Sequence, residues 1–68
     1  MAVVKVIEIM ADSPVSWEDA AQIACAEAAK TVKNIKSIYI QDMQAIVEGD
    51  KIVKYRVNTK ISFVVGDR

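Results

Sequence analysis

Apolar and polar residues alternate along the last quarter of the chain, from residue 51 to residue 65. A period of two is typical of a strand that buries one face and leaves the other polar. Two earlier segments, 3–10 and 35–47, are rich in β-branched residues, which favour strands. A turn cluster at residues 11–14 ends the first segment. Residues 48–51 predict a tight hairpin turn, because Gly49 can adopt positive φ.

The alternation in segment 51–65 divides its side chains between two faces. The predicted core face carries mainly apolar residues: Val53, Tyr55, Val57, Thr59, Ile61, Phe63 and Val65. The opposite face carries polar residues: Lys54, Arg56, Asn58, Lys60 and Ser62. In segment 35–47, Ile38 and Ile40 belong to the core face. Their neighbours then share the polar face: Ser37, Tyr39 and Gln41.

The same alternation fails farther along segment 35–47, where it would turn Asp42 and Gln44 toward the core. A β-bulge near Met43 would correct this, because one extra residue returns the following side chains to their faces. With a two-residue turn at residues 49–50, three pairs are predicted across the hairpin: Met43 with Arg56, Gln41 with Asn58, and Tyr39 with Lys60.

The stretch between the first two strands is rich in alanine and predicts a helix over residues 17–33. Ser16 is a good N-cap, and Asp19, three residues later, completes a pattern that resembles a capping box. Lys30 and Lys33 are predicted to lie in the last turn, where the helix dipole favours positive charge, and Asn34 to end the helix. The predicted apolar stripe consists mainly of small residues: Trp17, Ala20, Ala21, Ala24, Cys25, Ala28 and Val32.

These elements follow one another as β-α-β-β and predict an α+β fold. A right-handed crossover makes the first two strands parallel, and the hairpin makes the third strand antiparallel to the second. With the third strand in the middle, the chain forms a three-stranded antiparallel sheet of order 1-3-2 packed on one helix. Nothing in the chain is left to cover the other sheet face, so we expect partner subunits to cover it.

The chain has 68 residues with nine basic and nine acidic side chains, so its net charge is near zero. We expect a single domain over residues 1–68, whose thin core favours oligomerisation. The balanced charge argues against nucleic acid as a partner. No segment reaches the ~18 apolar residues that span a membrane. The single cysteine, Cys25, suits a reducing compartment, so the predicted location is cytoplasmic.

The sequence contains no catalytic signature and no histidine. This excludes His-based zinc sites and nucleophiles paired with histidine, so we interpret the protein as a binding protein and not an enzyme. Acids near a turn could bind a cation, since hard cations prefer carboxylate and carbonyl oxygens. The alternative is that these acids are solvated or form the turn. The candidates are Glu8, Asp42, Glu48 and Asp50, and we assign no metal ligand among them.

The polar sheet face has the most distinctive chemistry of the chain. It brings together Ser37, Tyr39, Arg56, Asn58 and Lys60. Its cationic side chains could recognise a phosphate or a carboxylate. The alternative is that they form ion pairs between subunits with Glu8, Asp42 and Glu48.

Several segments together resemble the dodecin family. They are Val4-Lys5-Val6-Ile7-Glu8-Ile9, Ser16-Trp17-Glu18-Asp19-Ala20-Ala21, Thr31-Val32-Lys33-Asn34-Ile35-Lys36, and Tyr55-Arg56-Val57 followed by Ser62-Phe63. The resemblance implies a hollow homododecamer. It also implies flavin, as FMN or riboflavin, for the ligand, because many dodecins bind flavins.

Two positions depart from the flavin-binding dodecins. The resemblance places the flavin-stacking Trp of that group at Ser37 and its flavin-bonding Gln at Arg56, whereas Asp42 matches an acid of the group. A serine cannot supply ring stacking. The sequence resembles a branch of the family that lacks the flavin pair and is linked to calcium binding. We therefore expect a homo-oligomeric protein that binds or stores a small ligand of the flavin type, with Ser37, Asp42 and Arg56 as candidate site residues. The alternative is a shell that binds calcium or another cation, or is purely structural.

Overall fold

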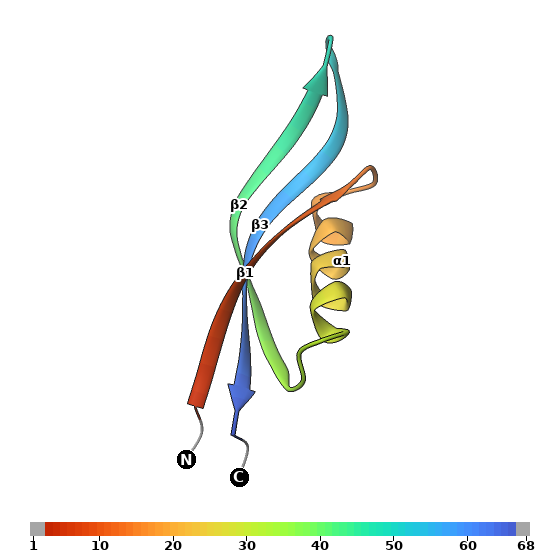
Figure 1. Ribbon diagram of the computed structural model, residues 1–68. Helices are drawn as coiled ribbons and strands as arrows, with labels where there is room; N and C mark the ends of the chain where they lie inside the picture. Colours follow the sequence, from red (N-terminus) through yellow and green to blue (C-terminus); the bar gives the residue numbers. More distant parts are fainter. Residues whose placement is uncertain (1–2, 67–68) are drawn as a thin grey trace.

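The computed structural model describes residues 3–66 of the chain. It contains strand β1 (Val3–Ser13), helix α1 (Trp17–Ala29), strand β2 (Ile35–Glu48) and strand β3 (Lys51–Val65), in the predicted β-α-β-β order. The three strands form one antiparallel sheet of order β1-β3-β2, which confirms the predicted topology. Helix α1 lies against one face of this sheet, and the β2–β3 hairpin extends well beyond it (Figure 1).

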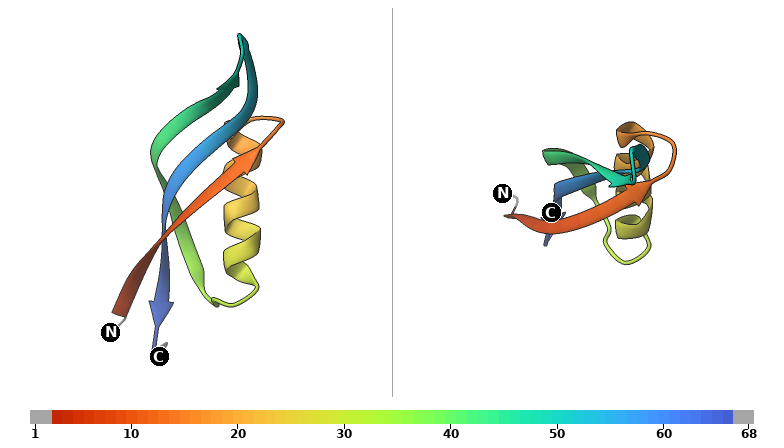
Figure 2. Two further views of the ribbon diagram at one scale, coloured as in Figure 1. Left: turned by 45° about the horizontal axis from the view of Figure 1, so that its top comes forward. Right: turned by 90° about the horizontal axis from the view of Figure 1, so that it is seen from above.

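The core lies between α1 and the central strand β3. Three alanines on one stripe of α1 are almost completely buried, namely Ala20, Ala24 and Ala28. In β3 the buried residues are Val57, Thr59 and Ile61. The hydroxyl group of Thr59 donates a hydrogen bond of 2.7 Å to the carbonyl oxygen of Ile9 in β1, so its burial leaves no polar group without a partner. Figure 2 shows α1 beside one face of the sheet, and the side chains of α1 that are buried there are small.

Helix α1 begins as the sequence predicts. Ser16 has extended backbone dihedrals, and its hydroxyl group accepts a hydrogen bond of 3.0 Å from the backbone N–H of Asp19. The Asp19 carboxylate, however, accepts a hydrogen bond of 2.6 Å from the hydroxyl group of Ser13 at the end of β1. Asp19 thus ties the helix to the preceding strand, because the buried Ser13 hydroxyl requires a partner.

Helix α1 ends at Ala29, so the predicted end near Lys33 is wrong. The β-branched residues Thr31 and Val32 disfavour helix. The last turn is tightened by bonds from the backbone N–H groups of Lys30 and Thr31 to carbonyl oxygens three residues earlier. Neither Lys30 nor Lys33 therefore lies in the last turn. Asn34, with φ 65°, then turns the chain into β2. No helix within residues 3–66 is long and apolar enough to cross a membrane.

The register of the β2–β3 hairpin differs from the predicted one. The structure has shifts at three places, between Ile35 and Ser37, between Ile40 and Asp42, and between Ile46 and Val47. The expected bulge thus falls at Gln41 instead of Met43. The shift between Ile46 and Val47 leaves Val53 without a partner, and it places Arg56 opposite Gln44 and Asn58 opposite Asp42, so two of the three predicted pairs are wrong. The bulge at Gln41 then compensates for this offset. The predicted pair of Tyr39 with Lys60 is confirmed.

Candidate functional site

We call the sheet face that points away from α1 the outer face. Val57, Thr59 and Ile61 are buried under α1, so the residues between them on β3 belong to the outer face. Residues directly paired across neighbouring strands share a face, and the register therefore assigns the others. The outer face comprises Val4, Val6, Glu8, Met10 and Asp12 of β1, Ser37, Tyr39, Asp42, Gln44 and Ile46 of β2, and Lys54, Arg56, Asn58, Lys60, Ser62 and Val64 of β3.

Two hydrogen bonds join Arg56 and Asp12 on the outer face as a fork. The two residues are directly opposite in the register of β1 and β3. The Arg56 Nε atom donates to Asp12 Oδ1 at 2.6 Å, and Nη2 donates to Oδ2 at 3.0 Å. The side chains are only 34% and 31% exposed, so neighbouring groups partly shield the fork from water. Paired charge-assisted hydrogen bonds of this kind fix both the position and the orientation of the guanidinium group.

The fork changes the acid–base properties of both partners. The hydrogen bonds from Arg56 lower the pKa of Asp12 below its ordinary value of 3.8 and outweigh the opposite effect of burial. The positive charges of Arg56 and Lys54 lower the pKa of Asp12 further. In the other direction, the hydrogen bonds to Asp12 raise the pKa of Arg56. Both groups are therefore ionised at neutral pH, and their charges cancel.

Asp12 is the residue that the sequence analysis missed. Ala, Asp, Ser and Pro in succession favour a turn, so the strand was predicted to end at Met10 and Asp12 to lie in the turn cluster. Strand β1 instead continues to Ser13, and its last residues pair with Tyr55, Arg56 and Val57. The Arg56 partner is consequently an acid of the same chain and not one of the three acids expected from another subunit. The usable signal was that Asp12 continues the alternation of Glu8 and Met10.

Two further polar contacts lie along the outer face. The Lys60 ammonium group is 3.8 Å from a carboxylate oxygen of Glu8, which is its direct neighbour in β1. Glu8 was an expected partner of the cationic residues, and the contact lies within one chain. The hydroxyl groups of Ser37 and Ser62 form a hydrogen bond of 2.5 Å across β2 and β3. Arg56, Lys60 and the candidate Ser37 thus each have a partner on a neighbouring strand.

The candidate residues Ser37, Asp42 and Arg56 all lie on the outer face, but they do not form one cluster. Asp42 is the diagonal neighbour of Arg56, because Asp42 is opposite Asn58 and Gln44 is opposite Arg56. Diagonal neighbours are ~7–8 Å apart. Ser37 is opposite Ser62, at six residues or roughly 20 Å from Arg56 along β3. One chain thus brings Asp42 near Arg56 and keeps Ser37 apart from both.

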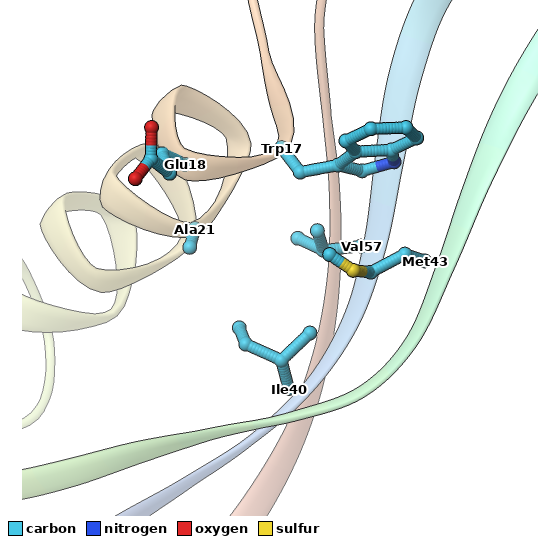
Figure 3. A pocket seen from close by; sticks show the side chains of 6 residues that line it. All are labelled: Trp17, Glu18, Ala21, Ile40, Met43 and Val57. Atoms are coloured by element: carbon cyan, nitrogen blue, oxygen red, sulfur yellow. The ribbon is translucent and has the colours of Figure 1, made fainter.

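A small apolar pocket lies on the other side of the sheet, beside the start of α1. It has a volume of about 120 Å³ and is lined by Trp17, Glu18, Ala21, Ile40, Met43 and Val57. Figure 3 shows the indole ring, the Met43 sulfur and Val57 gathered together, with the Glu18 carboxylate pointing away. The Trp17 indole N–H donates to the Gln44 carbonyl oxygen at 2.9 Å, and its ring meets that of Tyr55 edge-on at 4.9 Å. Trp17 therefore fastens the helix start to both strands of the hairpin.

A cation site requires several oxygen ligands, and calcium takes six to eight. Within residues 3–66, no three side chains of Asp, Glu, Cys or His come close enough together to hold a metal ion. Asp42 is exposed and makes no salt bridge within this part of the chain. The amide side chains of Asn58 and Gln44 lie beside it on the outer face. This group offers one carboxylate and two amide oxygens, which is fewer than the six to eight oxygen ligands that calcium takes.

The helix on one side and the open polar face on the other define a known class of small α+β protein. The fold is similar to that of the tt0972 protein from Thermus thermophilus, with a TM-score of 0.92 over the whole of both chains and 22% identity. It is also similar to dodecin from Streptomyces davaonensis, with a TM-score of 0.91 over 97% of both chains and 18% identity. At these identities the likeness concerns the fold alone.

The chain belongs to the dodecin family, whose family model matches residues 3–66. It is 35% identical over 63 residues to calcium dodecin from Mycobacterium tuberculosis, which covers 93% of this chain and 89% of that protein. A solved structure of that calcium dodecin, with its calcium-binding site, has a TM-score of 0.81 and 34% identity over 90% of this chain and 87% of the other. The predicted family is therefore confirmed, and membership supports the expected class of oligomeric small-ligand-binding proteins.

The fork predicts how stability depends on pH. Because the folded pKa of Asp12 is lowered, the fork contributes fully above the ordinary pKa of 3.8 and is lost as the pH falls through the lower folded value. The melting temperature of Arg56→Gln should therefore lie below that of the wild type by a constant amount between pH 7 and pH 5. This gap should close only below pH 3.8. Thermal melts at one protein concentration measure it.

Lys60→Gln is the matched control, because it removes the base of the looser contact with Glu8. It should lower the melting temperature less than Arg56→Gln does, since an isolated exposed pair contributes little. A gap between wild type and Arg56→Gln that already closes between pH 7 and pH 5 would contradict the assignment of the fork.

Proposed function

We propose that this chain forms a homododecameric dodecin that binds calcium or a similar divalent cation and does not hold a flavin in the manner of flavin-binding dodecins. The observation that carries the proposal is that both residues at the positions of the flavin contacts are already hydrogen-bonded to neighbouring strands. Ser37 shares its hydroxyl hydrogen bond with Ser62, and Arg56 is held by Asp12. Both positions are thus satisfied by neighbouring strands before any ligand arrives.

Flavin recognition would need a ring for stacking and a group that both donates to and accepts from the pyrimidine edge. Ser37 has no ring, and aromatic stacking contributes about 0.5–1.5 kcal/mol beyond the buried area. Arg56 has only donors, and two of its nitrogen atoms already donate to Asp12. Tyr39 is a 64% exposed aromatic residue on the outer face, but it is opposite Lys60 and not at the position of the stacking Trp.

Cation binding is supported by the oxygen-bearing side chains around Asp42. Calcium prefers carboxylate and carbonyl oxygens, and Asp42, Asn58 and Gln44 present these groups side by side. The bases on either side of Asn58, the β3 partner of Asp42, are Arg56 and Lys60. The charge of Arg56 is cancelled by Asp12, and Lys60 makes the looser contact with Glu8. The similarity to the calcium dodecin of M. tuberculosis adds independent support.

The number of oxygen ligands that calcium requires supports a site shared between subunits. Residues 3–66 of one chain offer too few acidic side chains within reach of one another to complete a calcium site. Copies of the Asp42 group brought together by symmetry would multiply the carboxylates at one point. The proposal therefore places the cation between subunits, and assembly and cation binding depend on each other.

Self-assembly is supported by what the outer face exposes. Val4, Val6 and Met10 lie on it in β1, each 55–60% exposed. They form an apolar row that only Glu8 interrupts, and exposed apolar surface rimmed by polar residues marks contacts between proteins. Strands β1 and β2 are the two edge strands of the sheet, so the backbone groups along one side of each strand have no neighbouring strand to bond. Partner copies can cover the row and the edges together.

The remaining parts of the proposal follow from the sequence. Residues 1–68 form one dodecin-like domain, whose partners are its own copies and a cation. It acts as a binding or storage protein, without catalysis and without nucleic-acid or membrane partners. The proposed location is the cytoplasm, which suits the free thiol of Cys25.

Assembly predicts a mass in solution. Sedimentation equilibrium or light scattering should find twelve chains of 7.5 kDa, about 90 kDa in total, at micromolar concentration. The charged substitution Val6→Glu on the outer face should reduce this mass, because it buries an unpaired charge in the contact. Ile23→Glu, on the exposed side of α1, is the control. A stable monomer at that concentration would overturn the proposed assembly.

If Asp42 binds calcium, a substitution at this residue should lower the affinity for calcium. Calorimetric titration of the assembled wild type should detect calcium, and Asp42→Asn should weaken binding at least about tenfold, because affinity follows the number of charged ligands. Asp50→Asn is the matched control, since it makes the same chemical change in the hairpin turn. Equal affinity in the wild type and Asp42→Asn would remove Asp42 from the site, and no calcium binding by the wild type would refute the proposed cation.

The two flavin positions can be tested by restoring them. Wild-type protein should quench riboflavin fluorescence weakly or not at all. The double variant Ser37→Trp with Arg56→Gln should quench it strongly, because Trp supplies the ring and Gln supplies a donor and an acceptor. Each single variant should do less, since the two contacts restrict different motions of the ligand. Tight riboflavin binding by the wild type, or none by an assembled double variant, would contradict the interpretation of these positions.

A further inference from the structure

We propose that Asp12 determines which ligands the outer face accepts, because it occupies and neutralises Arg56 and thereby excludes anions. Asp12 is a positioning residue, since it acts through Arg56 and needs no contact with the ligand. This inference rests on the proposed function only in that the outer face is the ligand-binding face. It adds a residue that matches none of the flavin positions.

Without Asp12, the outer face of β3 would be a receptor for anions. Lys54, Arg56 and Lys60 all point from this face of the strand. Lys54 and Arg56 are close enough to Asp12 that both charges lower its pKa. A planar guanidinium group binds phosphate or carboxylate through two parallel hydrogen bonds, with lysines nearby as point charges. The row therefore contains the groups that phosphate recognition needs.

Asp12 takes the place of such an anion. Its two carboxylate oxygens accept one bond each from Nε and Nη2, which is one of the two edges through which a guanidinium group binds phosphate or carboxylate. An anion at this edge would have to displace a carboxylate held at 2.6 and 3.0 Å, and an anion at the remaining edge would still meet its negative charge. The internal acid thus competes directly with any anionic ligand.

The contact between Glu8 and Lys60 provides the internal comparison. It has the same arrangement, an acid of β1 directly opposite a base of β3, but its atoms are 3.8 Å apart and its side chains are 64% and 42% exposed. A single long contact in solvent holds the base only weakly. Of the two acids on this face of β1, Asp12 therefore controls the basic row.

The test uses Asp12→Asn, which removes the charge and keeps the size of the side chain. FMN and riboflavin share the flavin ring and differ by a phosphate group, so the ratio of their affinities measures anion recognition at the outer face. Asp12→Asn should bind FMN at least about tenfold more tightly than the wild type does, while the affinity for riboflavin stays the same. Inorganic phosphate should compete with FMN for the Asp12→Asn variant and reduce the gain in FMN affinity.

Glu8→Gln is the matched control, because it removes one negative charge from the same face of the same strand. It should change the FMN affinity less than about threefold, since it frees only the loosely held Lys60. In the double variant Asp12→Asn with Arg56→Gln, the gain should disappear. If Asp12→Asn does not assemble, Asp12→Thr replaces it with the same expectation, because threonine is favoured in strands.

An assembled Asp12 variant with no gain in the FMN-to-riboflavin ratio would overturn the proposal. An equal gain in Glu8→Gln would also overturn it, because net charge and not the fork would then explain the result. These outcomes are separate from the calcium titration of the wild type. A failure there would refute the proposed cation and leave the role of Asp12 standing.

Discussion

One short helix has to cover a sheet with two faces, and the rest of the molecule follows from this constraint. Helix α1 has 13 residues and is roughly 20 Å long, whereas the 15 residues of β3 extend roughly 50 Å. Even the covered face is therefore covered along less than half of its length. The alanine stripe uses this short contact well, because it brings the helix close to Val57 and Ile61. Within the described residues 3–66 the outer face has no such cover, so its side chains must find partners elsewhere.

Partners on the outer face come first from the neighbouring strands. Because β3 is the central strand, its bases meet β1 on one side and β2 on the other. The acids are on β1, which explains why Arg56 and Lys60 pair with Asp12 and Glu8. Strand β2 contributes neutral oxygens and the exposed Asp42. The face thus divides into a side where charges are paired within the chain and a side where one acid is available for a cation or another copy.

Most of the architecture was predictable from residue patterns, and the errors have local causes. Strand order, the helix start at Ser16 and the two faces of β3 follow from alternation, capping and connectivity, which act over short distances. The end of β1 was missed because Asp12 and Ser13 favour turns in isolation, whereas pairing with β3 keeps them in the strand. The bulge was placed near Met43 because residue types show that the alternation fails at Asp42 and Gln44 but do not show which residue is the extra one. The shift between Ile46 and Val47 was missed. These small errors decided the site, since they hid Asp12 and paired Arg56 with Met43 instead of Gln44.

The chemistry of the outer face therefore cannot be deduced from residue types alone. Arginine at the position of a flavin-bonding glutamine suggests an added positive charge and an anionic ligand. The structure contains the opposite balance, because the fork to Asp12 cancels that charge and occupies one of the two edges with which arginine can hold an anion. A substitution in a ligand site is thus a change in a pair, and its effect depends on the residue across the strand. Here Asp12 cancels the positive charge of Arg56. The nearby carboxylate of Asp42 makes no salt bridge within residues 3–66, and its negative charge favours a cation.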